Sequence, residues 1–195
     1  MATRPVLVAL LASPRRQGNS AALLQAFLKP LTAWDVRVFH LPSLSIHPCQ
    51  ACDHCLRRKT YRCRYADDMT NLIQAWDTAT ALVLSTPVYY YGFPSQAKAV
   101  IDRCHPLFHD SHWQKHARRP AYLLANCAAS QKSEFKVITH EARAFLNTIA
   151  FKLTGELLVT GMGSRNAGER LVWAQKRAET LGKALNGRKG MPHAG

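Results

Sequence analysis

Four cysteines stand close together in the first third of the chain, at Cys49, Cys52, Cys55 and Cys63. Three cysteines at two-residue gaps can fold around one centre, and the fourth can close it from the far side. Zinc sites more often pair two C-x2-C motifs a dozen or more residues apart. The tripled spacing is closer to [4Fe–4S] ligation in ferredoxins. It favours an iron–sulfur cluster, with a zinc site or a loop that carries no metal as the alternatives.

The residues around these cysteines are rich in positive charge. Side chains between the third and fourth cysteine are predicted to offset the negative charge of a thiolate-ligated cluster. They are Arg57, Arg58, Lys59 and Arg62. His47 and His54 flank the cysteines and are alternative ligands, although we expect them to be ordinary loop residues.

A polar loop, SPRRQGNS at 13–20, lies between an apolar segment and a helical pattern. It brings hydroxyls, a guanidinium and a glycine to the start of a helix, where free N–H groups and the helix dipole bind anions. Gly18 lets the backbone come close to the anion. The loop matches neither GxxxxGK[ST] nor GxGxxG. A single flavin phosphate therefore fits better than a pyrophosphate, and the alternative is an ordinary capped turn.

A second loop with ligand-binding character is TPVYYYGFPS at 86–95. The three consecutive tyrosines, Tyr89–Tyr91, cannot all point into a core, because their hydroxyls need water or partners. Pro87 and Gly92 shape a loop whose backbone can reach a planar ring. The loop can grip an isoalloxazine by stacking and by backbone hydrogen bonds. The alternative is an aromatic surface patch or a dimer contact.

Histidines and two further cysteines raise other metal-binding possibilities. Four histidines fall within 104–118, at His105, His109, His112 and His116. Their spacings of 4, 3 and 4 would share one face of a helix, but Pro106 and the nearby aromatic residues argue against a continuous helix. We expect a solvent-facing or subunit-contact segment rather than a metal site. Cys104 and Cys127 lack ligand spacing and are expected to be buried thiols.

The elements that must position these residues alternate along the chain. Apolar runs predict strands at 5–12, 35–40, 81–85, 121–125 and 156–160. Amphipathic patterns predict helices at 19–28, over about ten residues after Asp67-Asp68, at 94–103, at 134–151 and at 167–185. Such alternation is typical of an α/β fold with a parallel sheet covered by helices on both faces.

In the flavodoxin-like variant of this fold the strand order is 2-1-3-4-5. Ligands bind at the carboxyl ends of strands 1 and 3, where the winding reverses. The loops at 13–20 and 86–95 follow those two strands, and the cysteine loop follows the neighbouring strand. We expect one FMN-binding domain over residues 1–195, with a cysteine-rich loop at 47–66 and a flexible tail from 186.

Composition narrows the class of protein further. Of the 195 residues, 47% are hydrophobic and 19% charged, which indicates a globular chain. The longest apolar run, 6–12, is far shorter than the ~20 residues of a membrane span. Without a signal-peptide pattern, we expect a cytoplasmic protein. The net charge of +14 attracts anions, but the sequence has no helix-turn-helix, RRM or zinc-finger pattern that would indicate nucleic-acid binding.

Two motifs resemble those of the NAD(P)H-dependent FMN reductases of flavodoxin-like fold. They are S-P-R-x-x-G-N-S at 13–20 and P-x-Y-x-x-G-x-P-x-Q-x-K-x-x-I-D-R at 87–103, within a resemblance that covers 5–185. The cysteine loop, its seven-residue gap and Asp67-Asp68-Met69 make the chain more similar to the iron–sulfur flavoprotein branch. The third flavin loop, often glycine-rich in the family, reads NCAAS at 126–130 here, without glycine.

The resemblance implies which residues bind FMN. Those expected at the phosphate are Ser13, Arg15, Gly18, Asn19 and Ser20. Those expected at the ring and ribityl chain are Pro87, Val88, Tyr89, Tyr90, Tyr91 and Gly92. It also implies a homodimer or homotetramer, because an isoalloxazine held by exposed loops is commonly covered by a partner subunit.

We therefore expect an FMN-dependent oxidoreductase with NAD(P)H as electron donor and with no catalytic acid or base residue. Electrons would pass to a [4Fe–4S] cluster if one is present, or otherwise to a quinone or free flavin. Candidates for binding the 2′-phosphate of NADPH are Arg118, Arg119, Arg165 and Arg170. The alternative, a basic nucleic-acid-binding or regulatory module without redox activity, leaves both flavin loops unexplained.

Overall fold

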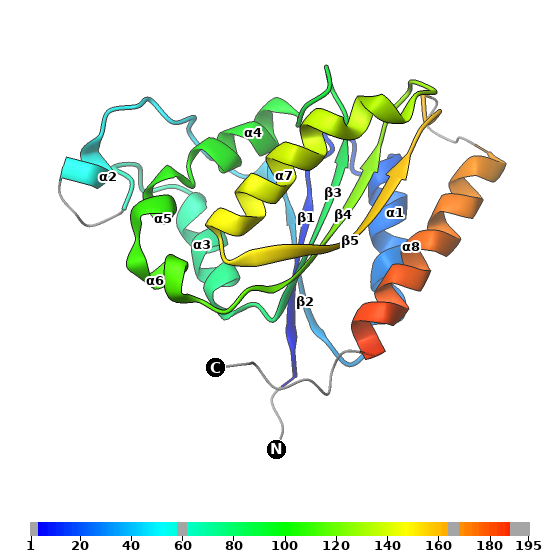
Figure 1. The fold of residues 1–195 in the computed structure, drawn as a ribbon, viewed down its shortest axis with the longest axis horizontal. Helices are drawn as coiled ribbons and strands as arrows, with labels where there is room; N and C mark the ends of the chain where they lie inside the picture. The colour runs from blue at the N-terminus through cyan, green and yellow to red at the C-terminus, as the bar shows by residue number, and fades with distance from the viewer. Residues whose placement is uncertain (1–3, 58–61, 164–167, 188–195) are drawn as a thin grey trace.

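The computed structural model describes residues 4–57, 62–163 and 168–187. Five parallel strands form a sheet in the order β2-β1-β3-β4-β5 (Figure 1). The strands are β1 (Val6–Leu11), β2 (Asp35–His40), β3 (Ala81–Pro87), β4 (Arg119–Asn126) and β5 (Phe151–Val159). The flavodoxin-like order predicted from the sequence is confirmed.

Helices of very different length connect the strands. They are α1 (Asn19–Leu28), α2 (His54–Arg57), α3 (Met69–Thr78), α4 (Ser95–Asp102), α5 (His105–His109), α6 (Ser111–Lys115), α7 (Lys136–Thr148) and α8 (Glu169–Gly187). Short 3-10 turns occupy Leu41–Ser43 and Lys132–Phe135. None of the helices in the described part of the chain is both long enough and apolar enough to cross a membrane.

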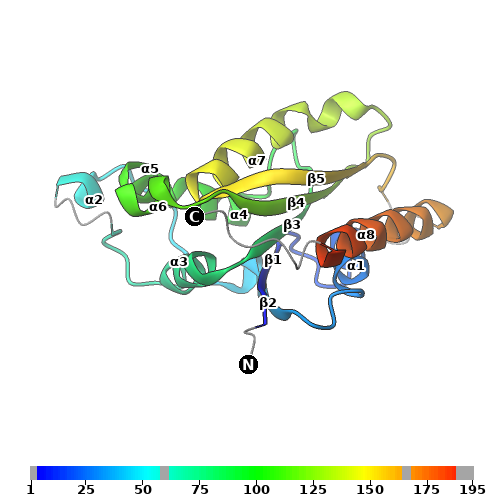
Figure 2. The ribbon, with the colours of Figure 1, turned by 60° about the horizontal axis from the view of Figure 1, so that its bottom comes forward.

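Helices cover both faces of the sheet (Figure 2). A hydrophobic core lies on each face. Along β1, Val8 and Leu10 pack with α3, α4 and α7, whereas Leu7 and Ala9 pack with α1 and α8. This alternation follows from the period of two in a strand. On the second face, α8 approaches α1 closely, because Gly182 has no side chain. A Cβ atom there would lie 2.1 Å from the carbonyl oxygen of Phe27.

The boundary between the fourth long helix and the last strand differs from the prediction. The sequence pattern predicts a helix over 134–151 and a strand only from 156, but α7 ends at Thr148 and β5 begins at Phe151. Ala150, with φ +60°, makes the turn between them, at a position where glycine is the usual residue. Because no glycine marks the helix end, the sequence gives no stop signal there.

The last helix also ends slightly later than the sequence pattern predicts. It runs from Glu169 to Gly187, whereas the prediction ended it at Leu185. The predicted start at Ala167 and the tail beyond Gly187 lie outside the described residues.

Candidate functional site

The loop after β1 turns tightly into α1. Ser13 is buried, and its Oγ accepts a hydrogen bond of 3.1 Å from the backbone N–H of Arg15. Gly18 occupies the N-cap of α1, and a Cβ atom there would lie 3.2 Å from Arg15 Cβ. Since the start of a helix presents unpaired N–H groups, the loop forms a backbone cradle, with the exposed side chain of Arg15 beside it.

Buried hydrogen bonds join this loop to the ends of β3 and β4. Ser20 Oγ donates to Asn126 Oδ1 at 2.7 Å, and Ser85 Oγ donates to the carbonyl of Ser20 at 2.7 Å. The carbonyl of Asn126 accepts from the backbone N–H of Val88 at 2.8 Å. Asn19 Nδ2 donates to the carbonyl of Met162 at 3.0 Å. The loops expected to hold FMN are therefore brought together at one edge of the sheet.

The tyrosine loop after β3 folds into a tight hairpin. The backbone of Tyr89 and Gly92 exchanges two hydrogen bonds of 3.0 Å, and Tyr90 and Tyr91 between them have φ of +48° and +67°. This is the type I′ pattern, in which glycine and asparagine are favoured at both central positions. Two tyrosines in the left-handed region cost free energy, and such strain clusters at functional sites.

The tyrosine side chains stand in solvent, as the sequence predicts. Tyr90 is fully exposed, and Tyr89 and Tyr91 are exposed by 43% and 52%. Figure 1 shows this hairpin projecting from the carboxyl end of the sheet, after β3 and ahead of α4. The hairpin thus offers exposed aromatic rings at the edge of the sheet where the start of α1 offers unpaired N–H groups.

Supporting residues beyond the motifs also hold the loop after β1. His40, the last residue of β2, contacts the carbonyl oxygen of Ser13 through Nε2 at 2.9 Å and Ser43 Oγ through Nδ1 at 2.6 Å. Arg16 also donates to Ser43 Oγ, so its side chain is directed toward β2. His40 and Asn126 were not predicted. The sequence feature that could have identified them is a polar residue directly at the end of a strand.

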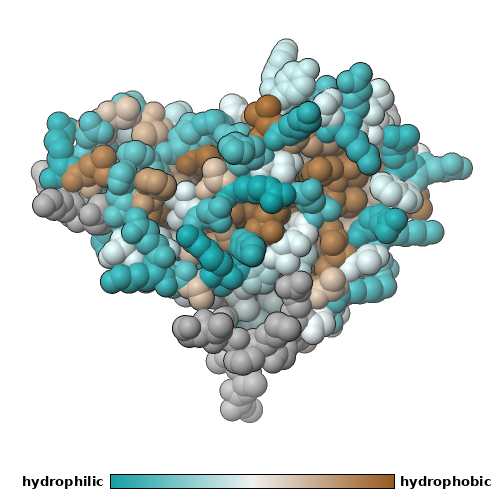
Figure 3. Space-filling view, viewed as in Figure 1, coloured by the Kyte–Doolittle hydropathy of each residue, from teal (hydrophilic) through white to brown (hydrophobic). Residues whose placement is uncertain are grey.

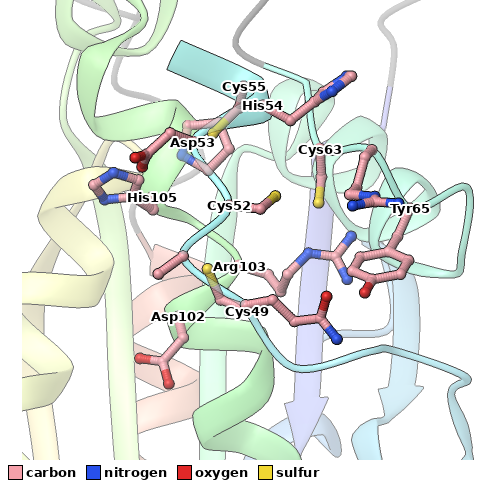
Figure 4. Close-up of a pocket in the computed structure, with 14 residues that line it drawn as sticks. Cys49, Cys52, Asp53, His54, Cys55, Cys63, Tyr65, Asp102, Arg103 and His105 are labelled. Carbon is pink, nitrogen blue, oxygen red and sulfur yellow. The ribbon is translucent and has the colours of Figure 1, made fainter. Parts of the chain in front are cut away.

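The four cysteines of the predicted cluster site line one cavity of about 500 Å³. Figure 4 shows the side chains of Cys49, Cys52 and Cys63 around a shared space, with Cys55 at the start of α2 beside it. Cys49 is exposed, and the other three are partly buried. Ala51 and Asp53 have φ of +50° and +54°. The second predicted site therefore also carries local backbone strain.

Positively charged side chains near the cysteines include residues that were not predicted. Arg58 and Lys59 lie outside the described residues, and Arg57 donates to the carbonyl of Cys52 at 2.5 Å. Among the described residues, Arg64 and Arg103 line the cavity. A hydrogen bond from the backbone of His54, together with the Arg64 guanidinium, lowers the pKa of Cys52. Burial raises the pKa of Cys55, and its neighbours Cys63 and Cys49 add to the rise.

A buried ion pair anchors the cysteine loop. Arg103 Nη1 donates to Asp67 Oδ2 at 2.7 Å and Nη2 donates to Asp67 Oδ1 at 3.0 Å, with both side chains at least 96% buried. Arg103 also donates to the carbonyl of His47 at 2.7 Å. Burial alone would raise the pKa of Asp67, but hydrogen bonds from Arg103 and the backbone of His47 hold it below its usual value. The pair thus fixes the chain just before the first cysteine.

The acidic pair before α3 has a role beyond helix capping. Asp68 occupies the N-cap position but makes no capping hydrogen bond with its side chain, and its Oδ2 accepts from the backbone N–H of Ser45 at 2.8 Å. Asp67 Oδ1 accepts from the N–H of Met69 at 3.2 Å. Both carboxylates therefore fasten the segment that leads into the cysteines. On the same segment, the ring of His47 stacks on Tyr65 at 4.7 Å.

One helix connects the two predicted sites. Helix α4 begins directly after the tyrosine loop, and its C-terminal residues Asp102 and Arg103 line the cysteine cavity. Eight residues of helix span about 12 Å, which separates the two sites within a chain. Both lie toward the carboxyl end of the sheet, as predicted.

The arginines considered for the NADPH phosphate fall in different places. Arg119 is wrong as a candidate: its guanidinium is buried against Phe151 and donates to carbonyls near the end of α3, including that of Trp76 at 2.7 Å. Arg118 donates to the carbonyl of Asn147, at the amino edge of the sheet. Arg170 donates to the carbonyl of Thr160 at 3.0 Å, at the carboxyl edge. Arg165 lies outside the described residues.

The remaining thiols and histidines lie largely where the sequence predicts. Cys104 and Cys127 are buried, as predicted. The histidine segment divides into α5 and α6, so a continuous helix is absent over 105–116. His105 and His109 are solvent-exposed, whereas His112 and His116 contact Asp77.

Comparison with known proteins shows the family of the chain. Residues 5–159 match the family described as NADPH-dependent FMN reductase, and the chain belongs to that family. An iron-sulfur flavoprotein of Archaeoglobus fulgidus is 39% identical over 104 residues, which are 52% of this chain and 52% of that protein. An iron-sulfur flavoprotein of Methanocaldococcus jannaschii is 35% identical over 94 residues, 47% and 46% of the two chains. The matches thus span about half the length of these relatives.

Solved structures share the fold at low identity. The FMN complex of an FMN-dependent NADH-azoreductase from Bacillus anthracis has a TM-score of 0.71 at 12% identity, covering 94% of this chain and 99% of the other. The NAD(P)H:quinone oxidoreductase from Methanothermobacter marburgensis has a TM-score of 0.69 at 16% identity, covering 94% and 98%. These likenesses confirm the flavodoxin-like fold, and the family match confirms the predicted resemblance.

Proposed function

We propose that the chain is an FMN-dependent oxidoreductase that takes electrons from NAD(P)H and holds a [4Fe–4S] cluster on Cys49, Cys52, Cys55 and Cys63. The observation that carries the flavin part is the joining of three loop regions by buried hydrogen bonds, with a strained tyrosine hairpin at their rim. Membership in the FMN reductase family supports the same activity.

The proposed phosphate site uses the backbone more than the side chains. The start of α1 and the close turn at Gly18 offer N–H groups to an anion, and Arg15 adds a charge-assisted hydrogen bond. Ser13 shapes the turn through Arg15. Asn19 and Ser20 hold this turn against Met162 and Asn126. In this proposal the last two are positioning residues for the phosphate.

The proposed ring site lies along 87–92. Val88 is fixed by the carbonyl of Asn126, which orients the backbone leading into the hairpin. The hairpin presents aromatic rings and the backbone edge of Tyr89–Gly92 toward solvent, where a planar ring can lie. When bound, FMN accepts a hydride from nicotinamide and can release electrons singly, which the side chains of this protein cannot do.

The donor set at the cysteine cavity fits an iron–sulfur cluster. Four thiols are among the residues that line the cavity of about 500 Å³, and the tripled spacing of three of them is closer to [4Fe–4S] ligation than to a zinc site. Arg64 and Arg103 face the thiols, and positive groups offset the negative charge of a thiolate-ligated cluster. Hydrogen bonding and charge around the sulfurs set the potential of such a group.

We also propose that the protein forms a homodimer or homotetramer. Figure 3 shows apolar surface over β5, between α7 and α8. Val137 of α7 and Val172 and Trp173 of α8 are exposed by 50% or more. β5 is an edge strand. A second copy on this face would cover apolar side chains and an open strand edge, both of which favour association.

The test compares the wild type with two cysteine variants after anaerobic purification and reconstitution. Cys52→Ser removes a cavity thiol, and Cys104→Ala, which removes a buried thiol outside the cavity, is the matched control. Iron, sulfide, zinc and FMN are measured per chain. We expect about four iron and four sulfide ions in the wild type and the control, almost none in Cys52→Ser, and one FMN in all three.

The other outcomes separate the parts of the proposal. One zinc without sulfide would contradict the cluster and make the loop a zinc site. FMN reducible by NAD(P)H without any metal would leave a flavin reductase only. A protein that binds no FMN at all would contradict the activity itself. For the assembly, light scattering after Trp173→Glu tests the oligomer, and an unchanged mass would place the interface elsewhere.

A further inference from the structure

Two histidines and an aspartate converge at the opposite edge of the sheet from the proposed flavin site. Asp77 lies near the C-terminal end of α3, which leads into β3, and His112 and His116 lie on and just after α6, which leads into β4. Figure 1 shows α3 and α6 on the side of the molecule away from the tyrosine hairpin. The group is therefore separate from the proposed flavin and cysteine sites.

The three ligand-type atoms form a compact triangle. His112 Nε2 lies 2.7 Å from Asp77 Oδ1, His116 Nε2 lies 3.3 Å from the same oxygen, and the two Nε2 atoms are 3.0 Å apart. Ligand atoms bound to one Zn²⁺ at about 2.0–2.1 Å are themselves roughly 3 Å apart. A single ion can therefore reach all three without moving the side chains far.

Hydrogen bonding alone satisfies this triangle poorly. A neutral imidazole carries one proton, and the nitrogen that carries it donates while the other accepts. If His112 Nε2 donates to Asp77, it cannot also donate to His116. If both Nε2 atoms carry protons, two N–H groups face each other at 3.0 Å. A cation between three lone pairs removes this conflict.

We propose that Asp77, His112 and His116 bind a divalent transition-metal ion of the Zn²⁺ class. Imidazole nitrogen with one carboxylate oxygen is a ligand set that suits such ions. Three protein ligands leave at least one coordination position for water, because Zn²⁺ is usually four-coordinate. Asp77 and His112 are exposed, so that position faces solvent.

The surrounding contacts hold the ligands in place. Trp113, between the two histidines, is buried and fixes α6 against the core, with its ring centroid 5.8 Å from each imidazole. Asp110 accepts from the backbone N–H of His112 at 3.0 Å and caps α6. Arg119 donates to the carbonyls of Trp76 and Ala79 and so fixes the backbone on either side of Asp77.

The ion would cross-link two helices. Helix α6 has five residues, too few to be stable alone. A metal shared by α3 and α6 would tie the segment before β4 to the helix before β3. Arg119 lies behind Asp77, and its positive charge repels a metal ion bound there. We therefore expect the ion to bind more weakly than at structural sites with four protein ligands.

The test measures Zn²⁺ bound per full-length chain at a buffered free concentration. His112→Ala and Asp77→Asn should each bind one Zn²⁺ fewer than the wild type. His109→Ala, an exposed histidine of the same segment, is the matched control and should bind as much as the wild type. Cys52→Ser should keep this ion, which separates it from any zinc on the cysteines. Zn²⁺ should raise the melting temperature of the wild type and control but not of His112→Ala.

A second measurement remains decisive even if a variant fails to fold. Anomalous diffraction at the zinc edge, on wild-type crystals soaked with Zn²⁺, should give a peak within about 2.0–2.2 Å of the three ligand atoms. The proposal is overturned if that peak is missing there, or if His112→Ala and Asp77→Asn bind as much Zn²⁺ as the wild type.

Discussion

The two loops proposed to bind the flavin leave β1 and β3 at the centre of the sheet, whereas the cysteine loop leaves the edge strand β2 and runs outward to the end of α4. The flavin loops are joined by hydrogen bonds between buried groups, such as Ser20 to Asn126. The position of the cysteine loop depends on the ion pair between Asp67 and Arg103, neither of which belongs to a strand. One site is part of the core, and the other is attached to it.

This difference predicts where each site is vulnerable. A site at strand ends shares the stability of the sheet, so a single substitution should change ligand affinity more than local order. A loop held by one buried ion pair should loosen as a unit when that pair is broken, because removing one partner leaves a buried charge.

Asp67→Ala should have the largest effect, a loss of about 3–5 kcal/mol in the free energy of unfolding. The substitution leaves the guanidinium of Arg103 buried without its carboxylate. Denaturant unfolding measures the loss, and hydrogen exchange should show it first at 45–55. Asp35→Ala is the matched control, because Asp35 pairs with Arg37 at an exposed site. That surface pair should contribute about 0–1 kcal/mol, and equal losses would contradict the anchoring role.

The same pair predicts an acid-sensitive cysteine loop. The folded pKa of Asp67 is lowered, so its ionised form adds stability in full above the unfolded value of about 3.9. That contribution is lost as the pH falls through the lower, folded pKa. Unfolding free energies of the metal-free protein should therefore drop in this acid range more for the wild type than for Asp67→Asn. Parallel pH curves would show that Asp67 titrates normally.

Arg15→Ala should weaken FMN binding by about 10–100-fold, the equivalent of one charge-assisted hydrogen bond of about 1.5–3 kcal/mol. Arg16→Ala is the control, because Arg16 is adjacent and equally charged but donates to Ser43. Fluorescence titration of FMN measures both dissociation constants. If the two variants lose the same affinity, the general positive field, and not a contact from Arg15, attracts the phosphate.

The sequence predicts the central part of this architecture well and the long-range contacts poorly. Buried apolar runs such as 81–85 identify the strands, and their alternation with helices indicates a parallel sheet. The order is expected from the flavodoxin-like variant, because ligand-type loops follow the first and third strands. Nothing local marks the start of β5, because Ala150 makes a turn that usually carries glycine. Ion pairs such as Asp67 with Arg103 join residues 36 positions apart, and a single sequence does not show which charges meet.

The same limit applies to the candidate sites. The residues proposed for the flavin and for the cluster lie in short motifs, so their spacing in the sequence identifies them. Asn126 and His40 support those motifs from other strands, and Asp77 meets His112 only because the fold brings the C-terminal end of α3 next to α6. The burial of Arg119 was not predicted either, since an arginine at the start of a strand is ordinarily exposed.

Ser20→Ala tests whether the central site is bonded into the core. The buried Asn126 Oδ1 would lose its donor, at a cost of about 1–3 kcal/mol in unfolding free energy. A double-mutant cycle with Asn126→Ala isolates the pairwise contribution. Ser130→Ala, at an exposed position of the neighbouring loop, is the control and should change little. Additive losses in the cycle would mean that the hydroxyl and the amide act independently.

Tyr91→Gly should have the smallest effect on stability and the opposite sign. Tyr91 has φ +67°, and a residue with a Cβ atom costs roughly 1–2 kcal/mol in the left-handed region. Glycine relieves this strain but adds freedom to the unfolded chain, so we expect a gain of at most about 1 kcal/mol. The half-exposed tyrosine ring buries little that would be lost.

FMN affinity should nevertheless fall, because the hairpin loses an aromatic ring and its fixed shape. Tyr65→Phe, in the cysteine cavity, is the control and should leave FMN affinity unchanged. A variant with lower stability and unchanged affinity would show that the strained hairpin serves the fold and not the flavin.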